Sequence, residues 1–89
     1  MPTRDVSLAP PRQVYVAGVN VGALQIKQDT DDPEAVVGVF NPEKGVAEPH
    51  WVRPGTEFTV AGRQFHVTRI QPLPDQRVDV TVTWPDELG

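Results

Sequence analysis

Hydrophobic and polar residues alternate most regularly over residues 58–67, on both sides of an Ala-Gly pair. Alternation with a period of two is typical of a half-buried β-strand, and two such runs joined by a two-residue turn predict a β-hairpin. With the Ala-Gly pair as the turn, Phe58 faces Phe65 and Val60 faces Arg63 across the two strands. One side of this hairpin is therefore predicted to form part of a hydrophobic core.

Similar patterns occur along the rest of the chain. Residues 13–21 alternate around a second Ala-Gly pair and continue into 24–28, so they predict a second hairpin. A β-branched run at 35–40 predicts a buried strand, and 77–84 alternates without interruption. Residues 4–8 predict a short edge strand before two prolines. We expect an all-β fold of six or seven short antiparallel strands in a small barrel or sandwich.

The two hairpins align at a constant offset of 44 residues, which places Val14 on Phe58. The third strands align without a gap, so that Phe40 falls on Trp84. This alignment predicts two copies of a three-stranded unit, with approximate two-fold symmetry: residues 10–42 and 54–85. The alternative is that two ordinary hairpins align by chance, because valines and Ala-Gly turns are common in β proteins.

Both hairpins also change phase at the same place, because Ile26 and Ile70 are out of step with the inward-facing residues before them. A β-bulge in each second strand restores the phase, near Gly22 in the first hairpin and within residues 66–69 in the second. The residues expected to face the core are Val14, Val16, Val21, Phe40, Phe58, Val60, Phe65, Val67, Val80, Val82 and Trp84.

Composition narrows the choice of partners. The 89 residues form one domain, and their net charge of −4 argues against a duplex nucleic-acid partner. The sequence has no cysteine, which excludes disulfides and thiolate metal sites and favours a cytoplasmic location. No apolar run predicts a signal peptide or a membrane span, so no membrane partner is expected.

No catalytic, metal or cofactor site is predicted. Four acidic residues at 29–34 start like a calcium loop, but they lack the glycine at the sixth position and the glutamate at the twelfth of an EF-hand. We interpret them as a solvated hairpin tip. His50 and His66 are the only imidazoles, and Ser7 is the only serine, so a nucleophile would lie on a terminal segment.

Residues 43–53 are predicted to be a connecting loop between the two units, and they contain His50-Trp51-Val52-Arg53. Tryptophan and arginine are enriched among interface anchors, so His50, Trp51 and Arg53, together with Arg69, are the candidate binding residues. The alternative is that Trp51 plugs one open end of a small barrel. Arg63, at the hairpin tip, and Arg77 are candidates for a mildly basic patch.

These features favour a non-catalytic module that binds another protein or itself. The alternatives are a small-ligand-binding β-barrel or small enzyme, and a virion or assembly component. Self-association is expected through residues 77–84, because a long, regular strand at a sheet edge can pair with its own copy as a homodimer.

Residues 51–70 carry the pattern Thr-x-Phe-x-Val-x-Gly-Arg-x-aromatic-x-Val-x-x-Ile after a Pro-Gly pair. In this segment the chain resembles a group of small all-β actinobacterial proteins of unknown function. Those proteins often have tryptophan where this chain has Phe65. The resemblance implies an all-β fold, and it implies no activity.

Overall fold

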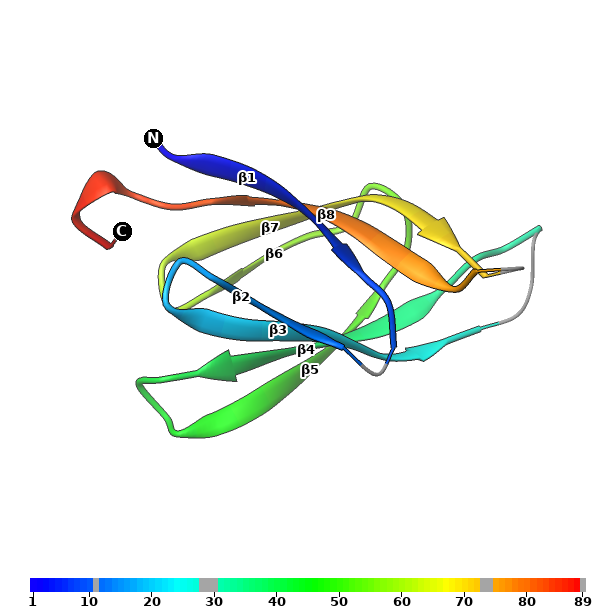
Figure 1. Cartoon of the computed structure of the whole chain (residues 1–89), viewed down its shortest axis with the longest axis horizontal. Coiled ribbons are helices and arrows are strands. Elements are labelled where there is room, and N and C mark those ends of the chain that lie inside the picture. Colours follow the sequence, from blue (N-terminus) through cyan, green and yellow to red (C-terminus); the bar gives the residue numbers. More distant parts are fainter. Residues whose placement is uncertain (11, 28–30, 73–74, 89) are drawn as a thin grey trace.

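The structure is a computed structural model that describes residues 1–10, 12–27, 31–72 and 75–88. These residues form eight strands and one short 3₁₀ helix, η1 (Asp86–Leu88) (Figure 1). The strands are β1 (Thr3–Leu8), β2 (Gln13–Val16), β3 (Val19–Ile26), β4 (Ala35–Asn41), β5 (Val46–Val52), β6 (Glu57–Val60), β7 (Arg63–Gln71) and β8 (Arg77–Thr83).

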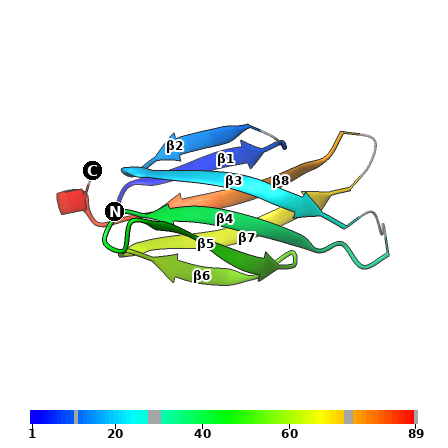
Figure 2. The same cartoon turned by 90° about the horizontal axis from the view of Figure 1, so that it is seen from below.

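The strands make two four-stranded antiparallel sheets that stack on each other. Sheet A has the order β1-β8-β7-β6 and sheet B the order β2-β3-β4-β5. Figure 2 shows β1 near β2 at one lateral edge of the stack and β5 near β6 at the other. The predicted all-β fold is confirmed, as a sandwich of eight strands in which neither sheet closes into a barrel.

Apolar side chains from both sheets form one core between them. Its buried members are Val6, Leu8, Val16, Val19, Val21, Ala23, Ile26, Ala35, Val37, Val39, Val52, Val60, Phe65, Val67, Ile70, Val78, Val80 and Val82. Val14, Phe58 and Trp84 pack against this core while partly buried, as expected. The assignment of Phe40 to the core is wrong, because Val37 and Val39 face inward and the alternation of β4 turns Phe40 outward.

The two hairpin turns are built as the sequence predicts. Phe58 pairs with Phe65 and Val60 with Arg63, and the turn residue Ala61 has a φ of 50°. Ala17 has a φ of 52°, and the glycine after each alanine also has a positive φ. Two consecutive residues with positive φ define the type I′ turn, which matches the twist of the strands.

The left-handed backbone conformation of these turns costs an alanine about 1–2 kcal/mol, because its Cβ crowds the following carbonyl oxygen. We expect Ala61→Asn to raise the free energy of unfolding by roughly 0.5–1 kcal/mol, because asparagine tolerates this conformation. Ala61→Val should lower it, since β-branched side chains are the most strained there. Thermal unfolding of both variants tests this, and equal melting temperatures would contradict it.

The two sheets repeat the same pairing scheme. β3 carries a bulge between Ala23 and Gln25, and β7 carries one between Val67 and Arg69. These positions lie 44 residues apart, so the predicted bulges are confirmed. The third strands do not keep that offset: Ala23 pairs with Val37, and Val67 pairs with Val80. The ungapped alignment of the third strands is therefore wrong by one residue.

Each sheet is completed by a fourth strand that the repeat did not include. Most of the predicted connector 43–53 is strand β5, at the edge of sheet B, where Pro49 is tolerated because edge strands have unpaired amides. Its counterpart in sheet A is β1, which pairs with β8 along its whole length. The predicted dimer edge at 77–84 is therefore an interior strand, and pairing with a second copy through it is ruled out.

Candidate interaction surface

The outward faces of the two sheets have opposite chemistry. In sheet A the outward side chains alternate with buried valines, and all of them are polar. They are Thr3, Asp5, Ser7, Glu57, Thr59, Gln64, His66, Arg69, Gln71, Arg77, Asp79, Thr81 and Thr83. One polar, solvated face is what an antiparallel sheet of a sandwich normally presents.

The outward side chains of sheet B are mostly apolar and carry no charge. We call them the sheet-B face: Gln13, Tyr15, Asn20, Gly22, Leu24, Gln25, Val36, Gly38, Phe40, Ala47, Pro49 and Trp51. Trp51 is 68% exposed, Tyr15 66%, Leu24 60% and Phe40 39%. Large apolar side chains gathered on one exposed face are typical of an interaction site, whereas isolated ones are ordinary.

The centre of the sheet-B face is a row of residues that runs across all four strands, with two glycines in its middle. Gln13 pairs with Gly22, Gly22 with Gly38, and Gly38 with Pro49. A Cβ on Gly38 would lie 2.9 Å from Cδ1 of Leu24, so the bulged Leu24 fills the space above this glycine. The two glycines also lie in a depression of about 150 Å³.

Two further pairs flank this central row. Phe40 pairs with Ala47 on one side of the row, and Val36 pairs with Trp51 on the other. Each pair sets a larger side chain beside a smaller one. The face is therefore neither flat nor uniform, with prominent side chains on both sides of a shallow floor.

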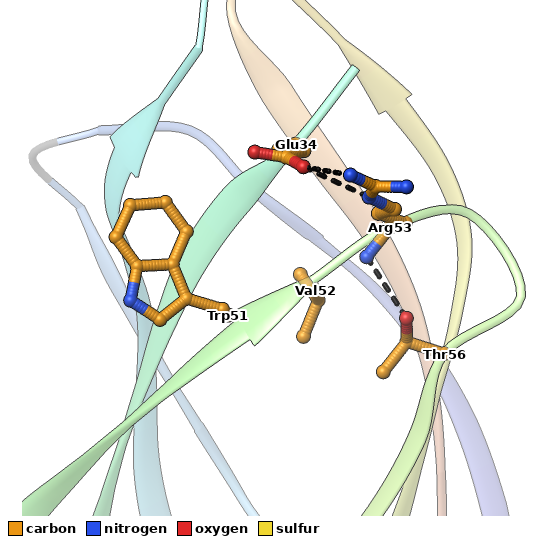
Figure 3. Close-up of a pocket in the computed structure, with 5 residues that line it drawn as sticks. All are labelled: Glu34, Trp51, Val52, Arg53 and Thr56. Atoms are coloured by element: carbon orange, nitrogen blue, oxygen red, sulfur yellow. Dashed lines mark hydrogen bonds and ion pairs between the residues drawn. The ribbon is translucent and has the colours of Figure 1, made fainter. Parts of the chain in front are cut away.

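Arg53 follows β5 and forms the charged border of this face near Trp51 (Figure 3). Its Nε donates to Oε1 of Glu34 at 2.8 Å, and Nη2 lies 3.7 Å from Oδ2 of Asp32. The Glu34 carboxylate raises the pKa of Arg53 further above its usual range. The backbone N–H of Arg53 donates to Oγ1 of Thr56 at 2.9 Å. These groups satisfy one another around a pocket of about 320 Å³.

Trp51 points outward, so it does not plug the end of a barrel. The imidazole of His50 instead closes an opening between the two sheets. His50 pairs with the inward-facing Val37 and stacks on Phe58 of the other sheet, with ring centroids 4.2 Å apart. Phe58 stacks in turn on Phe65 at 5.0 Å. This stack seals the lateral edge between β5 and β6, and Nε2 of His50 is buried there without a hydrogen-bond partner.

A buried nitrogen without a partner costs free energy, so we expect His50→Phe to keep or raise stability, by up to about 2 kcal/mol. The phenyl ring retains the stack on Phe58. His66→Phe is the control, because His66 is exposed and its Nδ1 lies 3.8 Å from Oε1 of Glu57. Urea denaturation measures both, and a loss of more than about 1 kcal/mol in His50→Phe would mean that Nε2 has a partner.

The structure does not gather the four predicted binding residues at one place. His50 faces the interior, Trp51 faces outward and Arg53 is engaged by acidic residues, while Arg69 lies exposed on β7 of the other sheet. Arg63 is 8% exposed, so its proposed contribution to a basic surface patch is wrong.

The other candidate groups are also accounted for. Ser7 donates from Oγ to Oδ1 of Asp79 at 2.8 Å, so its partner is a carboxylate and not a histidine. Of the acidic run at 29–34, Asp29 lies outside the described residues. In the described part of the chain no three His, Cys, Asp or Glu side chains gather as they would to hold a metal ion.

Sequence reasoning missed Tyr15, Leu24 and Phe40 as surface residues. The parity of Gln13–Val16 does place Tyr15 outward, but a single exposed tyrosine has no special meaning. Leu24 and Phe40 become meaningful only when β3, β4 and β5 are known to be neighbours. The signal that could show this is the run of residues 46–52, in which Pro49 and weak alternation favour a loop.

The chain belongs to a family of unknown function, DUF6406, which matches residues 4–86. The predicted resemblance to a family of unknown function is confirmed to that extent, over residues 4–86, and its assignment to actinobacteria stays a prediction. No curated protein and no solved structure matches the chain. Across the parts of the chain that the structure describes, no helix has the length and apolar character needed to span a bilayer.

Proposed function

We propose that the protein is a non-catalytic interaction module that binds an apolar, uncharged surface of another folded protein with its sheet-B face. The observation that carries this proposal is the contrast between the two sheets, since only one outward face exposes large apolar side chains. Exposing Trp51, Leu24 and Tyr15 to water is unfavourable for a free monomer, and covering them recovers that free energy.

The shape of the surface supports a protein partner over a small molecule. A small-molecule site is normally concave and encloses most of its ligand. The depression over Gly22 and Gly38 holds about 150 Å³, which suits one inserted side chain of a protein partner. Among the described residues, apolar side chains of both sheets pack between the sheets, which favours a surface site over the predicted ligand site inside a barrel.

Photo-cross-linking in living cells tests this function. A benzophenone amino acid at position 24 or 51 should form adducts with protein, because both side chains lie on the sheet-B face and are exposed. The same amino acid at Thr59, which is exposed on the outward face of sheet A, is the control. Adducts as abundant from position 59 as from 24 and 51 would contradict the proposal.

Two finer predictions are compatible with this function and stay predictions. An assembly component also needs an apolar face that a neighbour covers, so the virion or assembly hypothesis leads to the same experiment. The lack of cysteine supports a cytoplasmic location, because disulfides are rare in cytosolic proteins.

A further inference from the structure

We infer that the partner of the sheet-B face is a second copy of this chain, packed face to face about a two-fold axis along the Gln13–Gly22–Gly38–Pro49 row. This inference rests on the proposed function. Two sheets that pack face to face lie about 10 Å apart, and a two-fold axis between them makes the same patch serve both sides. The face must therefore be complementary to itself.

The order of residues along β4 and β5 provides that complementarity. An axis along the central row reverses the strand direction of one copy over the other, so positions equally far from the row come face to face. Trp51 and Ala47 are each two residues from Pro49, so Trp51 falls on the partner's Ala47. Phe40 and Val36 are each two residues from Gly38, so Phe40 falls on the partner's Val36. In both pairs the large side chain meets a smaller one, while Leu24, which lies over Gly38 on the row, comes close to its own copy at the axis.

Charge is consistent with this arrangement. The chain carries a net charge of −4, so two copies repel each other wherever their charged surfaces approach. The sheet-B face carries no charge, and the outward face of sheet A includes Asp5, Glu57 and Asp79. Packing through sheet B keeps those acidic groups on the far sides of the dimer. An interface limited to one four-stranded sheet face is small beside the roughly 800 Å² per partner of a standard interface, so we expect a dimer that dissociates on dilution.

Sedimentation of the purified full chain from about 1 µM to about 1 mM tests the inference. The expected result is a monomer that becomes a dimer as the concentration rises. The double variant Leu24→Glu, Trp51→Glu should weaken association by at least about 100-fold, because it buries four charges in one dimer interface. The matched variant Thr3→Glu, Thr59→Glu places the same charges on sheet A and should dimerise as the wild type does. Circular dichroism confirms that both variants are folded.

Introduced single cysteines can locate the two-fold axis. The chain has no cysteine of its own, so any cross-link must come from the introduced one. A residue on the axis row lies near its own copy, so Gln13→Cys and Pro49→Cys should each be joined into dimers by a bismaleimide about 10 Å long. Thr59→Cys should stay monomeric. A dimer in which neither Gln13→Cys nor Pro49→Cys is cross-linked overturns this axis.

A wild-type chain that stays monomeric throughout overturns the second-copy inference. If positions 24 and 51 then gave photo-adducts whose mass differs from that of two copies, the proposed function would stand, and the partner would be a different protein. Absence of any adduct at these positions would remove the proposed function as well.

Discussion

Replacing Phe65 with alanine is expected to lower the free energy of unfolding by about 3–5 kcal/mol. The ring is fully buried, and it is the largest of the fully buried side chains. It lies on β7, an interior strand of sheet A, so the neighbouring strands β6 and β8 restrain any collapse into the cavity. A domain of this size has a total stability of about 5–10 kcal/mol, so the variant should be near its unfolding threshold at 37 °C.

Phe58→Ala is the matched control for Phe65→Ala. The two rings stack on each other, but Phe58 is only partly buried and belongs to the four-residue edge strand β6. Its loss should cost roughly half as much, because part of its surface is already in water. Urea denaturation gives the midpoints for both variants. A midpoint for Phe65→Ala close to that of the wild type would show that the core does not depend on this ring.

The sequence predicted the core of sheet A well because local pattern and tertiary position agree there. In β6, β7 and β8 each inward apolar residue has polar neighbours, so alternation alone indicates which side faces the core. In β4 the pattern is apolar on both sides, since Val36 and Phe40 face outward on the same strand whose Val37 and Val39 face inward. Alternation cannot tell the two sides of such a strand apart, and the alignment of Phe40 with Trp84, which is off by one residue, predicts a core position for Phe40.

The candidate interaction surface depended on information that local pattern does not contain. Strand β5 contains Pro49 and has little alternation, which indicates a loop unless the strand lies at an edge. The sequence indicates Trp51 as an interface anchor, but its neighbours on the sheet-B face come from β2, β3 and β4. A sheet face is set by strand order and register, and these follow from how the two sheets pack.

Arg63 is the clearest example of a contact that the local sequence pattern does not reveal. It follows a hairpin turn, where arginine is normally solvated, although its pairing with Val60 puts it on the inward side of the hairpin. In the structure it faces inward beside Val60, at the end of the sandwich where the two Ala-Gly turns lie together (Figure 1). Its Nε donates to the carbonyl oxygen of Ala17 at 2.8 Å, and its Nη1 donates to that of Ala61. One side chain thus ties together two turns that are 44 residues apart.

Arg63→Ala is expected to cost about 2–4 kcal/mol, because it leaves the part-buried carbonyls of Ala17 and Ala61 without this donor and opens a gap between the sheets. Arg63→Lys should lose less, since it keeps the charge and most of the stem but cannot donate to both carbonyls in the same fixed geometry. Arg69→Ala, at an exposed position of the same strand, should stay within about 0.5 kcal/mol of the wild type. Hydrogen exchange adds a local readout, because loss of the bridge should increase exchange first in the two turns. If Arg63→Ala unfolded at the same urea concentration as Arg69→Ala, the sheets would be held together by the apolar core alone, and the bridge would contribute nothing measurable.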